Sequence, residues 1–420
     1  MSEEPAPAVD PRTGPLVDAG RVLDDLRELA RRTGDEDGAQ RVCWTPKWRE
    51  ARAYLAELLD ELGIAPETDE AGNNWAYVTG ENEPALALGS HLDSVPNGGW
   101  LDGALGVMAA LGVLRAWVDA GEVPPRTLAL VDWADEEGAR FGRSLFGSSA
   151  AAGTLDPSEL ADARDADGLG AQGVLAENGV ELGRVLEAES RLERVGSYLE
   201  LHIEQGPVME SGGIRAAAVT GCVGVERVRF TFSGQASHAG TTPMEARHDA
   251  GLAAAGSALR IEAIARDASG VGTVGDIDFE PGIPTAVPGR ASIMVDLRHA
   301  DPERLAEMLD RARRAADECA GERGCERTEE PIWRIAPTSF DPDLVALARR
   351  ACEQVTGEPF QLASGALHDA AEMARRVPSA MVFTSSMRGI SHAREEDTPE
   401  ADLRAGIEAF GTMANLHLAR

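Results

Sequence analysis

The sequence predicts an α/β protein built on a mixed, largely parallel sheet flanked by helices, with a smaller α+β domain of the ferredoxin-like type inserted into it. Two patterns indicate this fold class. Short, almost continuously apolar runs alternate with helical stretches, which is typical of strands buried on both faces of a parallel sheet. In the middle of the chain the apolar residues alternate with period two, and the expected order of elements is β-α-β-β-α.

The larger domain follows an N-terminal segment, residues 1–17, that is rich in proline and acidic residues and is expected to be disordered. From Asp18 the chain has helical periodicity, and the domain is predicted to occupy residues 18–222 and 334–420. A helix is expected over residues 102–121. The strands of this domain are predicted at residues 85–89, 127–133, 197–203 and 380–384.

The inserted domain is predicted to occupy residues 223–333. Its elements are a strand over 226–234, a helix over 244–267, two strands over 272–279 and 291–298, and a helix over 301–320. The alternating apolar residues of 226–232 suggest that this strand pairs with the same strand of a second copy, extending two sheets into one. This pairing would form a homodimer through the inserted domain, which is also expected to act as a lid.

Composition narrows the classes of partner. The 420 residues carry a formal net charge of −31, which repels nucleic-acid phosphates and anionic membranes, so neither is an expected partner. Five cysteines without a CxxC pair make a disulfide framework or a zinc knuckle unexpected. No apolar run approaches the length of a membrane span, and no signal-peptide core is evident, so a cytoplasmic location is expected.

Potential metal ligands follow four of the predicted strands. Residues 85–89 lead to His91 and Asp93, and residues 127–133 lead to the Asp135-Glu136-Glu137 run. The third strand contains His202, and the fourth leads to His392. A single histidine at a strand end is usually an ordinary polar residue. Three of only eight histidines at successive strand ends indicate a metal site, because ligand sites in open α/β sheets lie beyond the carboxyl ends of strands.

Asp102 lies in a glycine-rich loop just before a predicted helix. An aspartate in this position is often an ordinary helix N-cap. The glycines on both sides favour a tight functional loop instead, in which the carboxylate bridges two cations.

These residues occur within motifs that resemble those of a known family. In order along the chain the motifs are HLDSV, NGGWLDG, DEEGARF, LHIEQGPVME, SHAGTTPM, DLRH and SGALHDA. The same order is found in bacterial allantoate amidohydrolases, N-carbamoyl-L-amino acid hydrolases and β-ureidopropionases of the M20-type metallopeptidase clan. The resemblance extends from about Thr45 to the C-terminus, and HIEQG together with HAGTTPM is its most specific part.

The resemblance implies a pair of divalent cations. His91 and His202 resemble terminal ligands of different metals, Asp102 resembles the bridging carboxylate, and Glu137 and His392 resemble the remaining ligands. Mixed histidine and carboxylate ligands suit Zn²⁺ or Mn²⁺, and also Co²⁺ or Ni²⁺. Two cations about 3.5–4 Å apart can share one hydroxide, lower the pKa of bound water to about 7 and polarise a carbonyl.

The same resemblance assigns further roles near the metals. Glu136 looks like the general base that takes a proton from water and passes it to the leaving nitrogen. Asp93 resembles the partner that orients His91, a role that ligating imidazoles require. His238 looks like the histidine that stabilises the tetrahedral oxyanion, and in the family this histidine acts on the active site of the partner subunit.

Substrate contacts are also carried over by position. Arg298 resembles the arginine that binds the substrate carboxylate, since a guanidinium bonds a carboxylate in a bidentate manner; a surface arginine at a strand end is the competing interpretation. The other expected contacts are Gln205, Arg247, Thr285, Ser364, Gly365 and His368. The chain departs from the family pattern at Thr285, where asparagine is usual, and at Leu367, where glycine is usual.

The sequence therefore predicts metal-dependent hydrolysis of a linear amide or ureide that bears a carboxylate, such as an N-carbamoyl-L-amino acid or allantoate. A peptidase or aminoacylase of the same clan is the alternative within enzymes, and HIEQG and GTTPM argue against it. An inactive metal-binding assembly protein is the alternative outside enzymes. The presence of Glu136 argues against that, because a structural site has no use for a base that is not a ligand.

Overall fold

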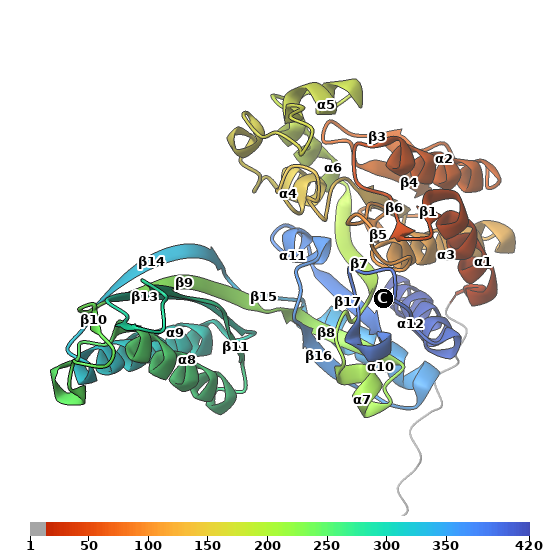
Figure 1. The fold of residues 1–420 in the computed structure, drawn as a ribbon. Helices are drawn as coiled ribbons and strands as arrows, with labels where there is room; N and C mark the ends of the chain where they lie inside the picture. The colour runs from red at the N-terminus through yellow and green to blue at the C-terminus, as the bar shows by residue number, and fades with distance from the viewer. Residues whose placement is uncertain (1–13) are drawn as a thin grey trace, which may run out of the picture. The chain divides into compact units, whose positions relative to one another are not determined.

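The computed structural model describes residues 14–420, which divide into two compact units (Figure 1). The first unit contains the chain up to Thr220 and again from Phe340 to Arg420, and the second contains Gly221–Ser339. The sequence predicted an inserted domain of residues 223–333. The second unit begins slightly before that range, at Gly221, and extends beyond it to Ser339. Most of the predicted N-terminal tail lies outside the described residues, and the Asp18 side chain caps α1 (Ala19–Thr33).

A mixed nine-stranded sheet forms the centre of the first unit. Its order is β15-β8-β17-β7-β5-β6-β4-β3, and β16 also pairs with β8. The four inner strands β17, β7, β5 and β6 run parallel, while β8 and β4 join them antiparallel. The strands are β3 (Glu67–Thr68), β4 (Asn74–Val78), β5 (Ala85–His91), β6 (Leu128–Trp133), β7 (Val195–Ile203), β8 (Ala216–Cys222), β15 (Thr338–Ser339), β16 (Gln361–Ser364) and β17 (Ser379–Thr384).

Helices cover both faces of this sheet, as the complete burial of every residue in β5, β6 and β17 requires. Helices α3, α10 and α12 pack on the inner strands, and α4 and α11 pack on β6 and β17 respectively (Figure 1). A two-stranded ribbon of β1 (Gly34–Asp35) and β2 (Gly38–Ala39) follows α1. The helices after α1 are α2 (Pro46–Asp60), α3 (Ala104–Ala120), α4 (Phe146–Ala152), α5 (Ala171–Glu177), α6 (Glu189–Leu192), α7 (Val208–Gly212), α10 (Pro342–Thr356), α11 (Asp369–Met373) and α12 (Glu400–Leu418).

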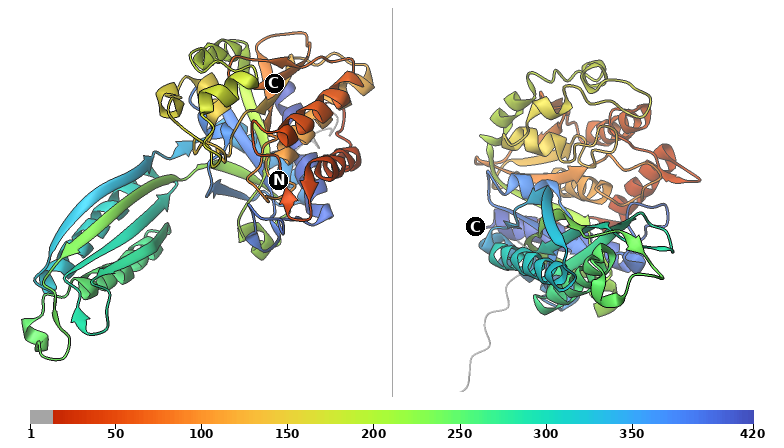
Figure 2. Two further views of the ribbon diagram at one scale, coloured as in Figure 1. Left: turned by 45° about the horizontal axis from the view of Figure 1, so that its top comes forward. Right: turned by 60° about the vertical axis from the view of Figure 1, so that its left-hand side comes forward.

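The second unit is a four-stranded antiparallel sheet with two helices on one face, which Figure 2 shows in green and blue-green. Alternate residues of the central strands, among them Phe230 and Val295, pack against the helices in one apolar core. Its elements are β9 (Gly224–Ser233), β10 (Ser237–His238), α8 (Ala250–Asp267), β11 (Val271–Glu280), β12 (Ala286–Val287), β13 (Arg290–His299), α9 (Pro302–Glu322) and β14 (Glu326–Ile335). The predicted fold class is confirmed in both units.

Two details of the second unit differ from the prediction. Helix α8 begins at Ala250 rather than 244, because the Asp249 side chain accepts a hydrogen bond from the Leu252 amide and caps it there. Strand β9 lies between β13 and β14, since the sheet order is β11-β13-β9-β14. The predicted pairing of residues 226–232 with a second copy is therefore wrong. The free edges belong to β11 and β14.

Within residues 14–420, no helix is long and apolar enough to cross a membrane. The expected cytoplasmic location stays a prediction.

A buried ion pair fixes the carboxyl edge of the large sheet. Asp132, in β6, is fully buried and accepts a 2.7 Å hydrogen bond from Nε of Arg52 in α2. Its other oxygen accepts a 2.8 Å hydrogen bond from the Leu92 amide, immediately after β5. The carboxylate thus ties the segment that carries His91 to the neighbouring strand.

We expect Asp132→Ala to lower the free energy of unfolding by about 3–5 kcal/mol, because it leaves the Arg52 charge buried and unpaired. Glu400→Ala removes exposed ion pairs with Arg27 and Arg404 and should change stability little. Urea unfolding of both variants and the wild type measures the difference. Equal stability of the two variants would contradict this account of Asp132.

Candidate metal centre

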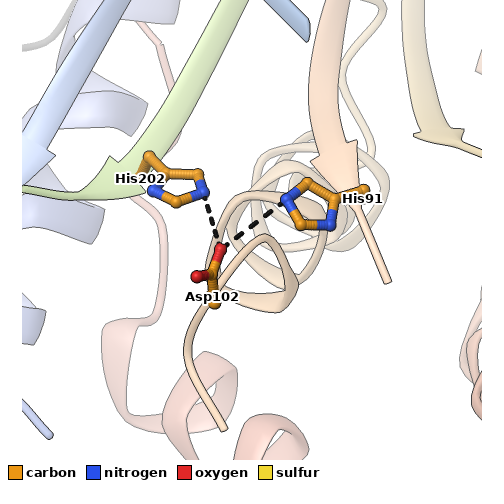
Figure 3. A group of neighbouring side chains, drawn as sticks. All are labelled: His91, Asp102 and His202. Carbon is orange, nitrogen blue, oxygen red and sulfur yellow. Dashed lines mark ion pairs between the residues drawn. The ribbon is translucent and has the colours of Figure 1, made fainter. Parts of the chain in front are cut away.

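The four inner strands of the large sheet deliver the predicted ligands to one edge. His91 is the last residue of β5, His202 is near the end of β7, and Glu137 follows β6 after a short turn. Asp102 comes from the loop before α3, and His392 lies beyond β17. Parallel strands end at the same edge, so their carboxyl ends bring these side chains together, as Figure 3 shows for His91, Asp102 and His202.

The Asp102 carboxylate lies between two sets of side chains. Its Oδ1 is 3.2 Å from Nε2 of His202 and 3.7 Å from Nε2 of His91 (Figure 3). Its Oδ2 is 3.3 Å from Nε2 of His392, whose Nε2 is in turn 3.5 Å from Oε2 of Glu137. His91 and His202 therefore share one oxygen of Asp102. The structure contradicts the expectation that these two histidines belong to different metals.

The two buried histidines are oriented through the ring nitrogen that faces away from Asp102. Nδ1 of His91 is 3.1 Å from the Asp93 carbonyl oxygen, and Nδ1 of His202 is 2.9 Å from the Ile203 carbonyl oxygen. Because a carbonyl only accepts, each Nδ1 carries the hydrogen. Each Nε2 is directed toward Asp102, and its lone pair would become available to a cation once it has lost its proton.

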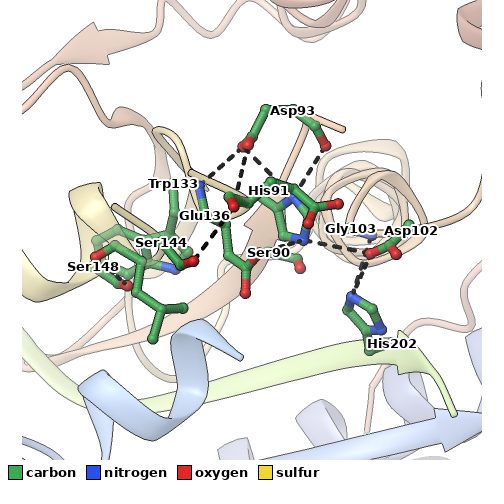
Figure 4. A network of polar contacts seen from close by, with 12 residues as sticks. Ser90, His91, Asp93, Asp102, Gly103, Trp133, Glu136, Ser144, Ser148 and His202 are labelled. Atoms are coloured by element: carbon green, nitrogen blue, oxygen red, sulfur yellow. Dashed lines mark hydrogen bonds and ion pairs between the residues drawn. The ribbon is translucent and has the colours of Figure 1, made fainter. Parts of the chain in front are cut away.

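Asp93 has a wider role than the one expected. Its Oδ1 lies 3.6 Å from Nδ1 of His91, and its two oxygens also accept hydrogen bonds from the amides of Glu136 and Glu137 (Figure 4). One carboxylate thus positions both the first histidine and the turn that carries the two glutamates. Oε2 of Glu136 lies 3.7 Å from Nε2 of His91, on the opposite side of that ring from Asp93.

The local backbone allows the loop of Asp102 to approach the histidines closely. Gly103 has φ +64°, and a Cβ there would overlap the His91 ring. Only glycine adopts this conformation without strain and leaves space for the imidazole. The glycines around Asp102 therefore serve the geometry of the site as well as the start of α3.

The charges of the site perturb one another strongly. Burial alone would raise the pKa of Asp102, but hydrogen bonds from His202 and His392 hold it well below its usual range. The same contact with Asp102 raises the pKa of His392 to about 9. Burial and the neighbouring Asp102 charge raise the pKa of Glu137 to about 7, and burial raises the pKa of Glu136 well above its ordinary value.

These observations fit a pair of divalent cations. Three histidines and two carboxylates form two sets of potential ligand atoms, each within 4.8 Å of one another, and Asp102 belongs to both. Oε1 of Glu137 is buried without a hydrogen-bond partner among the described residues. Such an oxygen is expected where a carboxylate ligates a cation. Nitrogen and oxygen donors of this kind suit Zn²⁺, Mn²⁺, Co²⁺ or Ni²⁺.

The expected substrate residues of the first unit lie around the same edge. Nε2 of Gln205 donates a 2.9 Å hydrogen bond to Oδ2 of Asp102. His368 is buried, with its ring centroid 4.4 Å from that of His202, and its Nε2 lies 2.9 Å from Oγ of Ser364. Burial and the neighbouring His202 hold the pKa of His368 well below its usual range, so it is neutral. Gly365 lies in the exposed turn between them.

His238, in the second unit, is exposed on β10 and has a defined tautomer. Its Nδ1 accepts hydrogen bonds from the amides of Gly240 and Thr241 at 3.0 and 3.2 Å. Nε2 therefore carries the hydrogen and can donate it. The Thr285 carbonyl accepts from the Ala239 amide. Arg247, expected as an anion contact, donates to the carbonyls of Ala239 and Thr242 and so holds the loop that presents His238.

Arg298 lies near the end of β13 beside a second arginine. Its Nε donates to Oδ1 of Asp296 at 2.8 Å, and Arg227 donates to Oδ2 of Asp296 at 2.9 and 2.6 Å. The Asp296 carboxylate thus holds two guanidinium groups side by side. A guanidinium is suited to bind an anionic group of a substrate.

Sequence reasoning missed two buried carboxylates of the site. Glu200 lies two residues before His202 on β7 and accepts hydrogen bonds from Ser90, Tyr198 and the Ala370 amide. A charged residue inside an otherwise apolar strand was the signal for it. Glu396 is buried and accepts from the Leu101 and Asp102 amides. No local pattern indicated Glu396, because these two amides lie almost 300 positions earlier in the chain.

The fold and the paired ligand sets define a class of protein: a metal-dependent hydrolase with an inserted α+β domain. The chain belongs to peptidase family M20/M25/M40, whose model matches residues 87–416. It is 37% identical over 400 residues to an N-carbamoyl-L-amino acid amidohydrolase of Geobacillus stearothermophilus, covering 94% of this chain and 97% of the relative.

Two further proteins place the chain within the family. It is 30% identical to an allantoate amidohydrolase of Bacillus subtilis, over 93% of this chain and 95% of that one. A crystal structure of a hydantoinase/carbamoylase family amidase from Burkholderia multivorans superimposes with a TM-score of 0.86 at 32% identity, covering 95% and 98% of the two chains. The chain is thus an amidohydrolase, an enzyme that hydrolyses carbon–nitrogen bonds.

Proposed function

We propose that the protein hydrolyses a linear amide or ureide that bears a carboxylate, an N-carbamoyl-L-amino acid or allantoate, with two divalent cations in the candidate metal centre. The observation that carries the proposal is the position of Asp102, whose two oxygens face His91 with His202 on one side and His392 on the other. A carboxylate placed in this way can bridge two cations. The names of the relatives supply the two substrate classes.

The cations and Glu136 would have different roles in the reaction. When bound, the cations would lower the pKa of a water molecule to about 7 and polarise the substrate carbonyl. Glu136 lies beside His91 and belongs to neither ligand set, so it is placed to hold the proton of the attacking water. A carboxylate in this place can take a proton from the water and then pass it to the leaving nitrogen.

The second unit would supply further substrate contacts. His238 presents a hydrogen on Nε2, which can bond the oxyanion that develops on the carbonyl oxygen. Arg298 and Arg227, linked through Asp296, would bind the substrate carboxylate. Closure of the second unit or a partner subunit would bring these groups to the metal centre.

Purified protein that has been stripped with a chelator should release no ammonia from any substrate. After addition of Mn²⁺, Co²⁺ or Zn²⁺ it should release ammonia from allantoate or from an N-carbamoyl-L-amino acid. A coupled ammonia assay over allantoate, N-carbamoyl-β-alanine and several N-carbamoyl-L-amino acids measures both results. Full activity in the chelated protein, or hydrolysis only of dipeptides and N-acyl amino acids, would contradict the proposal.

Substitution separates the proposed base from the proposed ligand. Glu136→Gln should keep two ions per chain and lose roughly 10²–10⁴-fold in kcat, since it removes only the proton carrier. Glu137→Gln should lose one ion, because its carboxylate faces His392 in the second ligand set. Metal analysis and steady-state kinetics of the two variants provide the comparison. Loss of an ion from Glu136→Gln would reverse the two roles.

We further propose that the enzyme is a homodimer joined along β11. This strand is a free edge of its sheet, and it carries partly exposed Ile277 and Phe279. The adjoining helix α8 exposes Leu252 and Leu259, the latter to 71%. An edge strand beside exposed apolar side chains is suited to isologous pairing with a second copy.

A mixture of two inactive variants tests whether His238 acts on the partner's metal centre. The homodimers of Glu136→Gln and of His238→Ala should both be nearly inactive. A mixed dimer has one site with Glu136 from one chain and His238 from the other, so activity should partly return after subunit exchange. Mixed dimers identified by native mass spectrometry that show no recovery would contradict the role in trans. A fully active monomer would contradict the dimer.

A further inference from the structure

A buried carboxylate outside both ligand sets is bonded to the loop of the shared aspartate. Glu396 is 1% exposed and follows His392 by four residues. Its Oε1 accepts hydrogen bonds from the amides of Leu101 and Asp102, at 3.2 and 3.0 Å. These amides belong to the turn that leads into α3, so Glu396 holds the backbone from which the Asp102 side chain projects.

The other oxygen of Glu396 reaches the Asp102 side chain through one hydroxyl. Oγ of Ser391 lies 2.8 Å from Oε2 of Glu396 and 3.0 Å from Oδ2 of Asp102. A hydroxyl has a single hydrogen, so Ser391 donates to one of these carboxylates at a time. Oδ2 is the oxygen of Asp102 that faces His392, which is the residue next to Ser391.

The fit of Glu396 into the loop accounts for a glycine that the metal centre itself does not require. A Cβ on Gly99 would overlap the Glu396 carboxylate. The neighbouring Gly103 leaves space for the His91 ring on the other side of Asp102. The glycine-rich loop is therefore held between a ligand on one side and Glu396 on the other.

A purely structural pairing of Glu396 with a buried cation does not explain these contacts. Burial lowers the pKa of the fully buried Arg41 guanidinium, and Glu396 is the carboxylate that opposes this effect most. Yet both Nη atoms of Arg41 lack hydrogen-bond partners among the described residues. The side-chain hydrogen bonds of Glu396 go to Leu101, Asp102 and Ser391.

We propose that Glu396 is a positioning residue for the second ligand set, which consists of Asp102, Glu137 and His392. The Glu396 carboxylate fixes the turn that carries Asp102, and Glu396 lies in the same short segment as His392. A single residue therefore holds two of the three ligands in position relative to each other. The first set also contains Asp102, but its other two ligands, His91 and His202, are anchored in β5 and β7. This inference rests on the proposed pair of cations.

The test is the stepwise binding of Co²⁺ to metal-free protein, followed by titration calorimetry and by metal analysis after gel filtration. In Glu396→Ala we expect the affinity for one ion to fall about 10–100-fold, as for the loss of other groups that orient ligands, and the affinity for the other ion to change much less. Glu395→Ala is the matched control, since Glu395 is adjacent in sequence and exposed, and it should bind both ions as the wild type does.

Glu396→Gln distinguishes position from charge. Its amide oxygen can still accept from the Leu101 and Asp102 amides, and its NH₂ can donate to Ser391, which then donates to Asp102. We expect this variant to bind both ions nearly as the wild type does. If Gln is as damaging as Ala, the negative charge of Glu396 matters rather than its position, and the inference is overturned. Equal weakening of both ions in Glu396→Ala overturns it as well.

A second variant covers the case in which Glu396→Ala does not fold, as judged by circular dichroism of the metal-free protein. Ser391→Ala removes only the hydroxyl between the two carboxylates and should weaken the same single ion. Unchanged binding of both ions by Ser391→Ala would then overturn the inference. A wild-type chain that binds fewer than two ions would instead overturn the proposed function, and this inference with it.

Discussion

The site depends on one constraint, the burial of the Asp102 carboxylate between imidazoles from opposite sides. An ionised carboxylate in such a place is unfavourable unless cations or hydrogen-bond donors surround it. His202 and His392 supply that compensation and hold its pKa well below the usual range. A pair of divalent cations would supply the same compensation in the active enzyme. The glycines, Asp93 and Glu396 serve to keep this arrangement in place.

The sequence allowed the fold class and the proposed ligands to be predicted because both depend on local patterns. Apolar runs identified the four parallel strands, and ligand-type residues followed each of them. His91, His202 and the Asp135-Glu136-Glu137 run could then be expected at one edge without knowledge of any contact, and the family resemblance indicated Glu137 as the ligand of that run. Which histidines share an oxygen of Asp102 could not be predicted, because strand order decides it. β5 and β7 are neighbours in the sheet, although more than 100 residues separate them.

Features that arise from long-range contacts could not be predicted from the sequence. The alternation in residues 226–232 identified a strand correctly, but an interior strand of a sheet with one covered face has the same pattern as an edge strand. Glu396 resembled any acidic residue in a charged segment until its hydrogen bonds to the Asp102 loop were known. Arg247 resembled an anion ligand, and its neighbours in space show that it holds the loop of His238.

The central claim is that Asp102 joins two cation sites, and anomalous diffraction from crystals grown with Zn²⁺ or Mn²⁺ tests it most directly. The account predicts two anomalous peaks about 3.5–4 Å apart on either side of the Asp102 carboxylate. One peak should be bound by His91 and His202, and the other by Glu137 and His392. A single peak, or two peaks that do not share Asp102, would contradict it.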